Sequence, residues 1–140
     1  MSDTADIRSY MARIITERGF HAGPNFVGPD GAVSIGAAAF LAAHGWEPEP
    51  FRTDEDLSVI LISCSAPAMQ AIKAISADLD TEPSFIQVTG DHDVPDYIEH
   101  VERWASTPQF PDEQPPAVAQ VIGRILRTND TFDTPRALAA

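Results

Sequence analysis

Cysteine is almost absent from this sequence, since Cys64 is the only one in 140 residues. An intramolecular disulfide and a cysteine-rich zinc site are therefore both excluded. Cys64 follows the apolar run 59–62 and Ser63, a setting typical of a buried and unreactive thiol.

Long apolar runs are also lacking. No stretch approaches the ~20 apolar residues that a membrane-spanning helix needs. The first six residues, Met-Ser-Asp-Thr-Ala-Asp, have neither the charged start nor the apolar centre of a signal peptide. We therefore expect a cytoplasmic protein without membrane contact.

Basic residues are scarce, because 9 lysines and arginines face 21 aspartates and glutamates, for a net charge of −12. Such a surface repels phosphate backbones, which excludes direct nucleic-acid binding, and it repels anionic membranes. The charge is typical of a surface kept soluble by self-repulsion. Two alternatives are an acidic mimic of nucleic acid and a partner with a basic face.

Catalytic signatures are missing as well. The chain has no Gly-x-Ser-x-Gly elbow, no His-Glu-x-x-His pair and no glycine-rich phosphate loop. The leading prediction is therefore a non-enzymatic interaction or regulatory protein. It would act on a protein partner or on a second copy of itself, without a cofactor.

The spacing of apolar residues predicts a mainly α fold of about five helices. We expect one domain over residues 1–140, which is an ordinary size for a domain. The predicted helices are one that ends at Gly19, then 32–44, one capped by Ser65 that ends near 79, then 94–105 and 116–127. The run 36–39, Gly-Ala-Ala-Ala, has so little side-chain bulk that another helix can approach it closely.

Two short apolar segments, 57–62 and 85–88, fit either a helix or a strand, because periodicity does not distinguish the two at this length. If both are strands, residues 57–89 form a two-stranded βαβ unit, and the fold is α+β. If neither is, the protein is entirely helical.

Proline marks two connectors, 46–53 and 106–116. The first contains Trp46 and Phe51, and exposed aromatic residues beside prolines are a candidate partner-binding surface. The alternative is that both rings fold back to cover the core, as large aromatic side chains usually do.

The densest polar cluster lies around the start of the predicted helix 94–105. Carboxylates and imidazoles together can hold a divalent metal such as Mn, Zn or Fe. This predicts a metal-binding protein or metal-dependent enzyme, with Asp91, His92, Asp93, Asp96 and His100 as ligands. The alternative is structural: Asp93 caps the helix, Pro95 fits its first turn, acids favour that turn, and Glu99 pairs with Arg103.

Four short segments of the first part of the chain suggest a family. These are Arg18-Gly19-Phe20, Gly23, Asp30-Gly31 and the run 34–37, Ser-Ile-Gly-Ala. The pattern resembles an uncharacterised family of small actinobacterial proteins, in which a helix ends in Gly-Trp and a Gly-Ala helix follows a variable loop. Here Phe20 stands in place of the tryptophan, and either 88–105 or 128–140 corresponds to the family's terminal Trp-Asn-Asp segment. The resemblance implies a mostly helical fold and no known activity.

Overall fold

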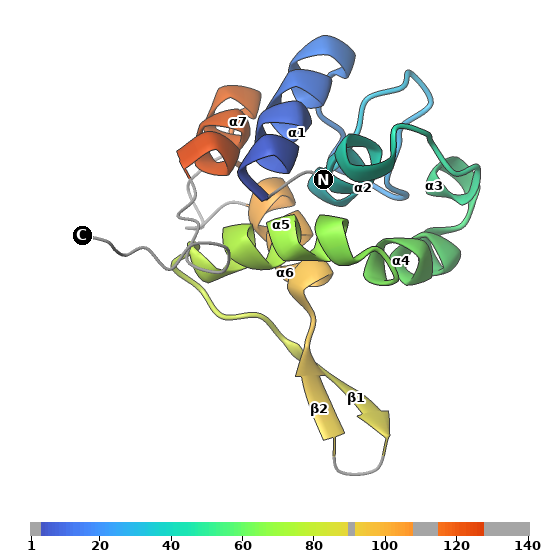
Figure 1. Ribbon diagram of the computed structural model, residues 1–140, viewed down its shortest axis with the longest axis vertical. Helices are drawn as coiled ribbons and strands as arrows, with labels where there is room; N and C mark the ends of the chain where they lie inside the picture. The colour runs from blue at the N-terminus through green and yellow to red at the C-terminus, as the bar shows by residue number, and fades with distance from the viewer. Residues whose placement is uncertain (1–3, 90–91, 108–114, 128–140) are drawn as a thin grey trace.

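The computed structural model describes residues 4–89, 92–107 and 115–127. Within these ranges it contains seven helices and one two-stranded sheet (Figure 1). The helices are α1 (Thr4–Arg18), α2 (Ile35–His44), α3 (Pro50–Thr53), α4 (Glu55–Ser63), α5 (Ala66–Ala77), α6 (Tyr97–Ser106) and α7 (Val118–Arg127). The predicted mainly α fold is confirmed, although α3 and α4 raise the number of helices above the predicted five.

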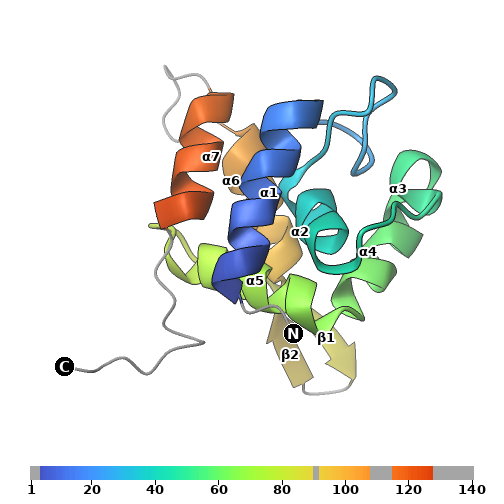
Figure 2. The same ribbon diagram turned by 45° about the horizontal axis from the view of Figure 1, so that its top comes forward.

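The helix α2 forms the centre of the core. All seven residues from Ile35 to Leu41 are buried. Ser34 caps the helix by accepting a hydrogen bond from the Ala37 amide at 3.3 Å, and Gly45 ends it at φ 80°. Helices α1 and α5 both pack on α2, and α7 lies beside α1 (Figure 2).

The small residues of α2 allow the close approach that the sequence predicts. A Cβ added at Gly36 would lie 2.8 Å from the Glu102 carboxylate of α6 and 3.0 Å from the Phe26 ring. Both distances are too short for a side chain to be inserted there without movement. Glycine at this position therefore sets the distance between α2 and α6.

The segment 57–62 is helical, so the helix is present of the two alternatives that the sequence left open. Asp54 caps α4 by accepting a hydrogen bond from the Leu57 amide at 3.1 Å. Ser58 and Ile62, four residues apart, are both buried, which is the spacing of one helix face. Cys64 ends α4 and is exposed, so the prediction of a buried thiol is wrong.

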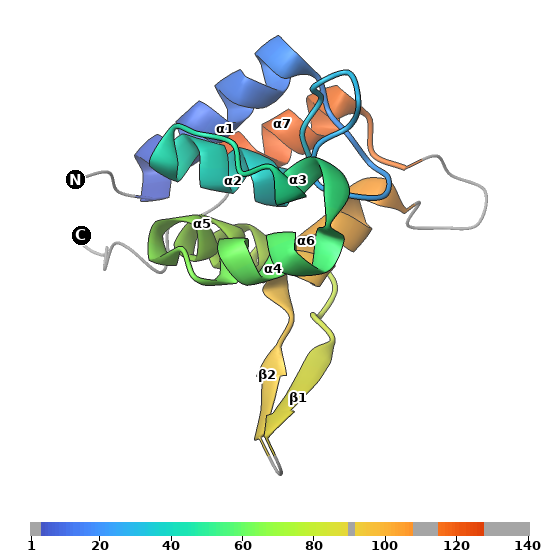
Figure 3. The ribbon, with the colours of Figure 1, turned by 90° about the vertical axis from the view of Figure 1, so that its right-hand side faces the viewer.

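The segment 85–88 is a strand, which is one of the two alternatives that the sequence left open, but its partner strand follows it in the chain. Strand β1 (Phe85–Thr89) pairs with β2 (His92–Pro95) in an antiparallel hairpin, so there is no βαβ unit. The hairpin extends away from the helices, on the side of α4 and α6 (Figure 3). Because β2 takes up residues 92–95, α6 begins at Tyr97 rather than at 94. Asp96 caps it, so the prediction that Asp93 would do so is wrong.

The segment 46–53 is more ordered than a connector. It contains α3 and the buried Phe51, which packs edge-on against Phe40 with ring centroids 5.3 Å apart. Glu47 pairs with Arg18 at 2.7 Å and with Arg52 at 2.6 Å. The hydrogen bond from Arg52 is the main cause that lowers the pKa of Glu47.

The end of the chain is described in part. Of the connector 106–116, residues 108–114 lie outside the described ranges, as does the segment 128–140. Val121 and Ile125 of α7 are buried against the core, whereas Val118 and Leu126 are exposed.

Among the described helices, no single one is long and apolar enough to cross a membrane. Helices α4 and α5 reach the necessary length and composition only when taken together, and the chain bends by 97° between them.

Candidate functional site

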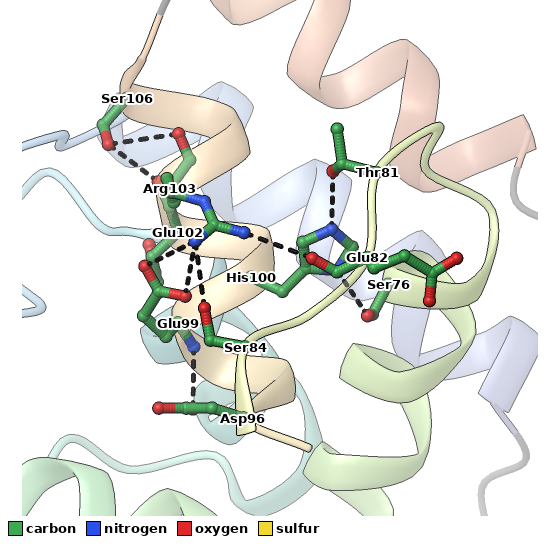
Figure 4. Close-up of polar contacts among 10 residues, drawn as sticks. All are labelled: Ser76, Thr81, Glu82, Ser84, Asp96, Glu99, His100, Glu102, Arg103 and Ser106. Carbon is green, nitrogen blue, oxygen red and sulfur yellow. Dashed lines mark hydrogen bonds and ion pairs between the residues drawn. The ribbon is translucent and has the colours of Figure 1, made fainter. Parts of the chain in front are cut away.

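Polar side chains line two sides of α6, where this helix follows the hairpin (Figure 4). One side, with His100, faces α5 and the loop that leads into β1. Glu102 and the capping Asp96 contribute to the other side, next to α2 and α4. The first side holds an imidazole with two hydroxyl groups, whereas the second side is acidic.

His100 is completely buried, and both of its ring nitrogens have hydroxyl partners. Ser76 Oγ lies 2.6 Å from Nδ1, and Thr81 Oγ1 lies 2.7 Å from Nε2. Burial, assisted by the positive charge of Arg103, lowers the pKa of His100. A neutral imidazole donates at one nitrogen and accepts at the other, so one hydroxyl accepts and the other donates.

A serine within hydrogen-bond distance of a histidine is also the arrangement of an activated nucleophile. Here Ser76 is only 2% exposed and His100 is 0% exposed, so both side chains are buried. Their hydrogen bonds join α5, the loop at Thr81 and α6. This network anchors the helical end from which the hairpin extends.

The carboxylate of Glu102 lies against the N-terminus of α2. Its Oε2 accepts a hydrogen bond from the Gly36 amide at 2.7 Å. Burial raises the pKa of Glu102 to about 7, although hydrogen bonds from Gly36, Ser34 and Ile35 act in the opposite direction. The negative charge of Glu55 adds to the rise.

A pocket of about 190 Å³ adjoins this carboxylate. Its walls combine apolar and acidic side chains from α4, α6 and the loop before α2. They are Phe26, Glu55, Val59, Asp96, Ile98, Glu99 and Glu102. The pocket is therefore a concave, negatively charged site with an apolar lining.

The predicted metal ligands are only partly within the described residues. Asp91 lies outside them, and the side chains of His92 and Asp93 are not described. Asp96 accepts a hydrogen bond from the Glu99 amide at 3.0 Å as the cap of α6, while His100 turns toward Ser76 and Thr81. Among the described residues, no group of three or more histidine, cysteine, aspartate or glutamate side chains could hold a metal. Metal binding by this cluster stays a prediction.

The ion pair that the structural interpretation of this cluster predicts is present. Arg103 and Glu99 pair at 3.1 Å, as their four-residue spacing predicts. Arg103 also donates to Ser84 Oγ and to the Glu82 carbonyl, both at 3.3 Å. It thus connects α6 to the segment that enters the hairpin.

The hairpin exposes apolar side chains on both faces. Phe85 is 64% exposed, Ile86 45% and Val94 42%; we call these three residues the hairpin patch. Ile86 lies opposite Val94, and Phe85 lies opposite Pro95. Residues directly opposite in a sheet share a face, and successive residues alternate. Ile86 and Val94 therefore share one face and are both exposed, while Phe85 is exposed on the other face beside the half-buried Pro95.

The two aromatic residues predicted to bind a partner have different environments. Phe51 is 0% exposed and lies in the core between Phe26 and Phe40, so it has no surface to offer. Trp46 is 56% exposed and meets the Phe40 ring edge-on with centroids 5.6 Å apart. Only Trp46 keeps the exposure that the partner-binding prediction requires.

We compared the chain with protein-family models, with curated proteins and with solved structures, and none matches. The resemblance to the actinobacterial family stays a prediction. The fold and the surface of this chain are therefore the basis for assigning its function.

Sequence reasoning missed the hairpin patch and Glu102. A signal for the first was present, because Gly90-Asp91 is a two-residue hairpin sequence and directly follows the segment 85–89, which is rich in β-branched residues. Nothing in the sequence marks Glu102, because its partner Gly36 lies 66 residues away.

Proposed function

We propose that this chain is a non-enzymatic interaction protein that binds a protein partner through its β1–β2 hairpin. The observation that carries the proposal is the exposure of the hairpin patch, with Ile86 and Val94 on one face of the hairpin and Phe85 on the other. An isolated two-stranded hairpin is marginally stable in water. A partner that covers one face or adds a strand would stabilise it.

The position of the hairpin supports the same function. It extends away from the helices (Figure 3), where a partner can reach both faces and both strand edges. The network of His100 and the contacts of Arg103 fix its helical end. A rigid base limits the conformational entropy that is lost on binding.

The experiment compares binding by the wild-type protein with binding by Ile86→Ser/Val94→Ser. Both side chains are about half exposed, so we expect an unchanged urea midpoint. Partners are captured from the host by crosslinking, identified by mass spectrometry, and then purified for titration. The matched control is Ile60→Ser, because Ile60 is 57% exposed on α4 and lies outside the patch.

We expect the purified partner to bind the wild type and Ile60→Ser equally, and the hairpin variant at least about tenfold more weakly. Equal binding by all three proteins would contradict the proposal. If only Trp46→Ala weakens the binding of the partner, the binding surface lies at the C-terminal end of α2 and not on the hairpin.

A further inference from the structure

The hairpin leaves strand edges without partners. Among the described residues, β1 and β2 pair only with each other. An unpaired edge offers backbone amides and carbonyls to any extended chain. Pro95 has no amide hydrogen, so β2 is the poorer edge, and β1 is the better site for an added strand.

The acidic pocket begins where the hairpin ends. Asp96, which follows the last residue of β2, is one of its walls. Glu55 and Glu102 face the same pocket, and the charge of Glu55 raises the pKa of Glu102, so the two carboxylates repel each other. Glu55 has a long contact of 3.5 Å with the Asn25 amide. A positive charge placed between these carboxylates would relieve their repulsion.

We infer that the occupant of the hairpin is an extended, basic segment of a partner protein, which adds to β1 and places a lysine or arginine side chain at the acidic pocket. This inference rests on the proposed function and names the chemistry of the partner. Apolar side chains of the segment would cover Phe85 or Ile86, and its cationic side chain would lie near Glu55 and Asp96. Alternating apolar and basic residues would satisfy both requirements.

Charge complementarity favours this occupant over a second copy of the chain. Each copy carries a net charge of −12, and the pocket that adjoins the hairpin is acidic. Two copies joined at β1 would bring these like charges together, which opposes association at ordinary ionic strength. The same negative charge attracts a basic segment and favours its association.

The test uses a phage-displayed library of random peptides, selected on the full-length protein at low ionic strength. Enriched peptides are synthesised with a fluorescent label, and their affinity is measured by polarisation. We expect alternating apolar and Lys or Arg residues. Affinity should fall with added salt. It should fall at least about tenfold for Ile86→Ser/Val94→Ser.

A charge variant tests the pocket. Glu55→Gln keeps the shape of the side chain, and we expect it to weaken the basic peptides about two- to fivefold, as for an exposed ion pair. The control is Glu17→Gln on α1, because α1 lies on the other side of the helical body from the hairpin (Figure 3). The control should leave the affinity unchanged.

Three results would overturn the inference. Enriched peptides that are neutral or acidic but depend on the hairpin would refute the basic partner and leave the proposed function standing. Peptides that bind the hairpin variant as well as the wild type would refute the docking site itself. The third result is that no peptide is enriched, while light scattering detects a dimer of the wild type that the Ile86→Ser/Val94→Ser variant does not form. This result would identify a second copy of the chain as the occupant.

Discussion

Replacing Glu102 by glutamine removes the carboxylate that α6 presents to the N-terminus of α2. The folded protein raises the pKa of this group from 4.5 to about 7. Between these two values the folded state binds the proton more tightly than the unfolded state. Stability therefore falls as pH rises through this window and is highest below about pH 4.5.

The size of the effect follows from the rise in pKa. A rise from 4.5 to about 7 corresponds to about 3 kcal/mol of unfolding free energy lost across the window. This figure is an upper value, because Glu102 is only partly buried and solvent screens its charge. Glutamine stays neutral at every pH and still offers an oxygen to the Gly36 amide.

The assay is urea unfolding of the wild type and Glu102→Gln, from about pH 4.5 to about pH 8. We expect equal stability at the acidic end and a variant more stable by up to about 3 kcal/mol at the basic end. The difference between the two proteins removes the contributions of other groups, such as Glu47, whose pKa is lowered. Parallel curves would refute the reasoning, since Glu102 would then not titrate in this window.

Four further substitutions test the packing and the exposure of single side chains. Gly36→Ala should destabilise the protein by about 1–3 kcal/mol in urea unfolding, because the added Cβ would lie 2.8 Å from the Glu102 carboxylate. At an ordinary helical glycine the same substitution stabilises, so a gain in stability would contradict the close approach of α2 and α6. Ser76→Ala should cost about 1–3 kcal/mol, because it leaves a nitrogen of the buried imidazole of α6 without its partner, and unchanged stability would show that this bond is not formed. Phe51→Ala should cost about 3–5 kcal/mol and Trp46→Ala less than about 1 kcal/mol, since one ring is buried and the other exposed; similar losses in thermal melts would contradict these environments.

Local sequence was enough where a single element decides its own structure. The capping serine at Ser65 and the left-handed Gly45 lie where the sequence places them, because caps depend on the residues next to them. The buried face of α6, Ile98 with Val101 and Ala105, follows from a spacing that only one face of a helix satisfies.

Segment 57–62 was ambiguous for a physical reason. Its β-branched residues suit a buried strand, yet Asp54 caps it as a helix, and the buried Ser58 and Ile62 fit a helix that packs on the core. Tertiary packing often decides such short segments against their local propensity.

The sequence by itself determined the composition, the acidic charge, the main helices and the caps, because each depends on residues close together in the chain. Only the tertiary structure decided that Phe51 is buried while Trp46 is exposed, and that His100 faces two hydroxyls. It also brought Glu102 to Gly36 across 66 residues and left the hairpin patch uncovered. Burial and pairing of this kind depend on which distant elements pack together. The spacing of residues along one segment does not predict which distant elements those are.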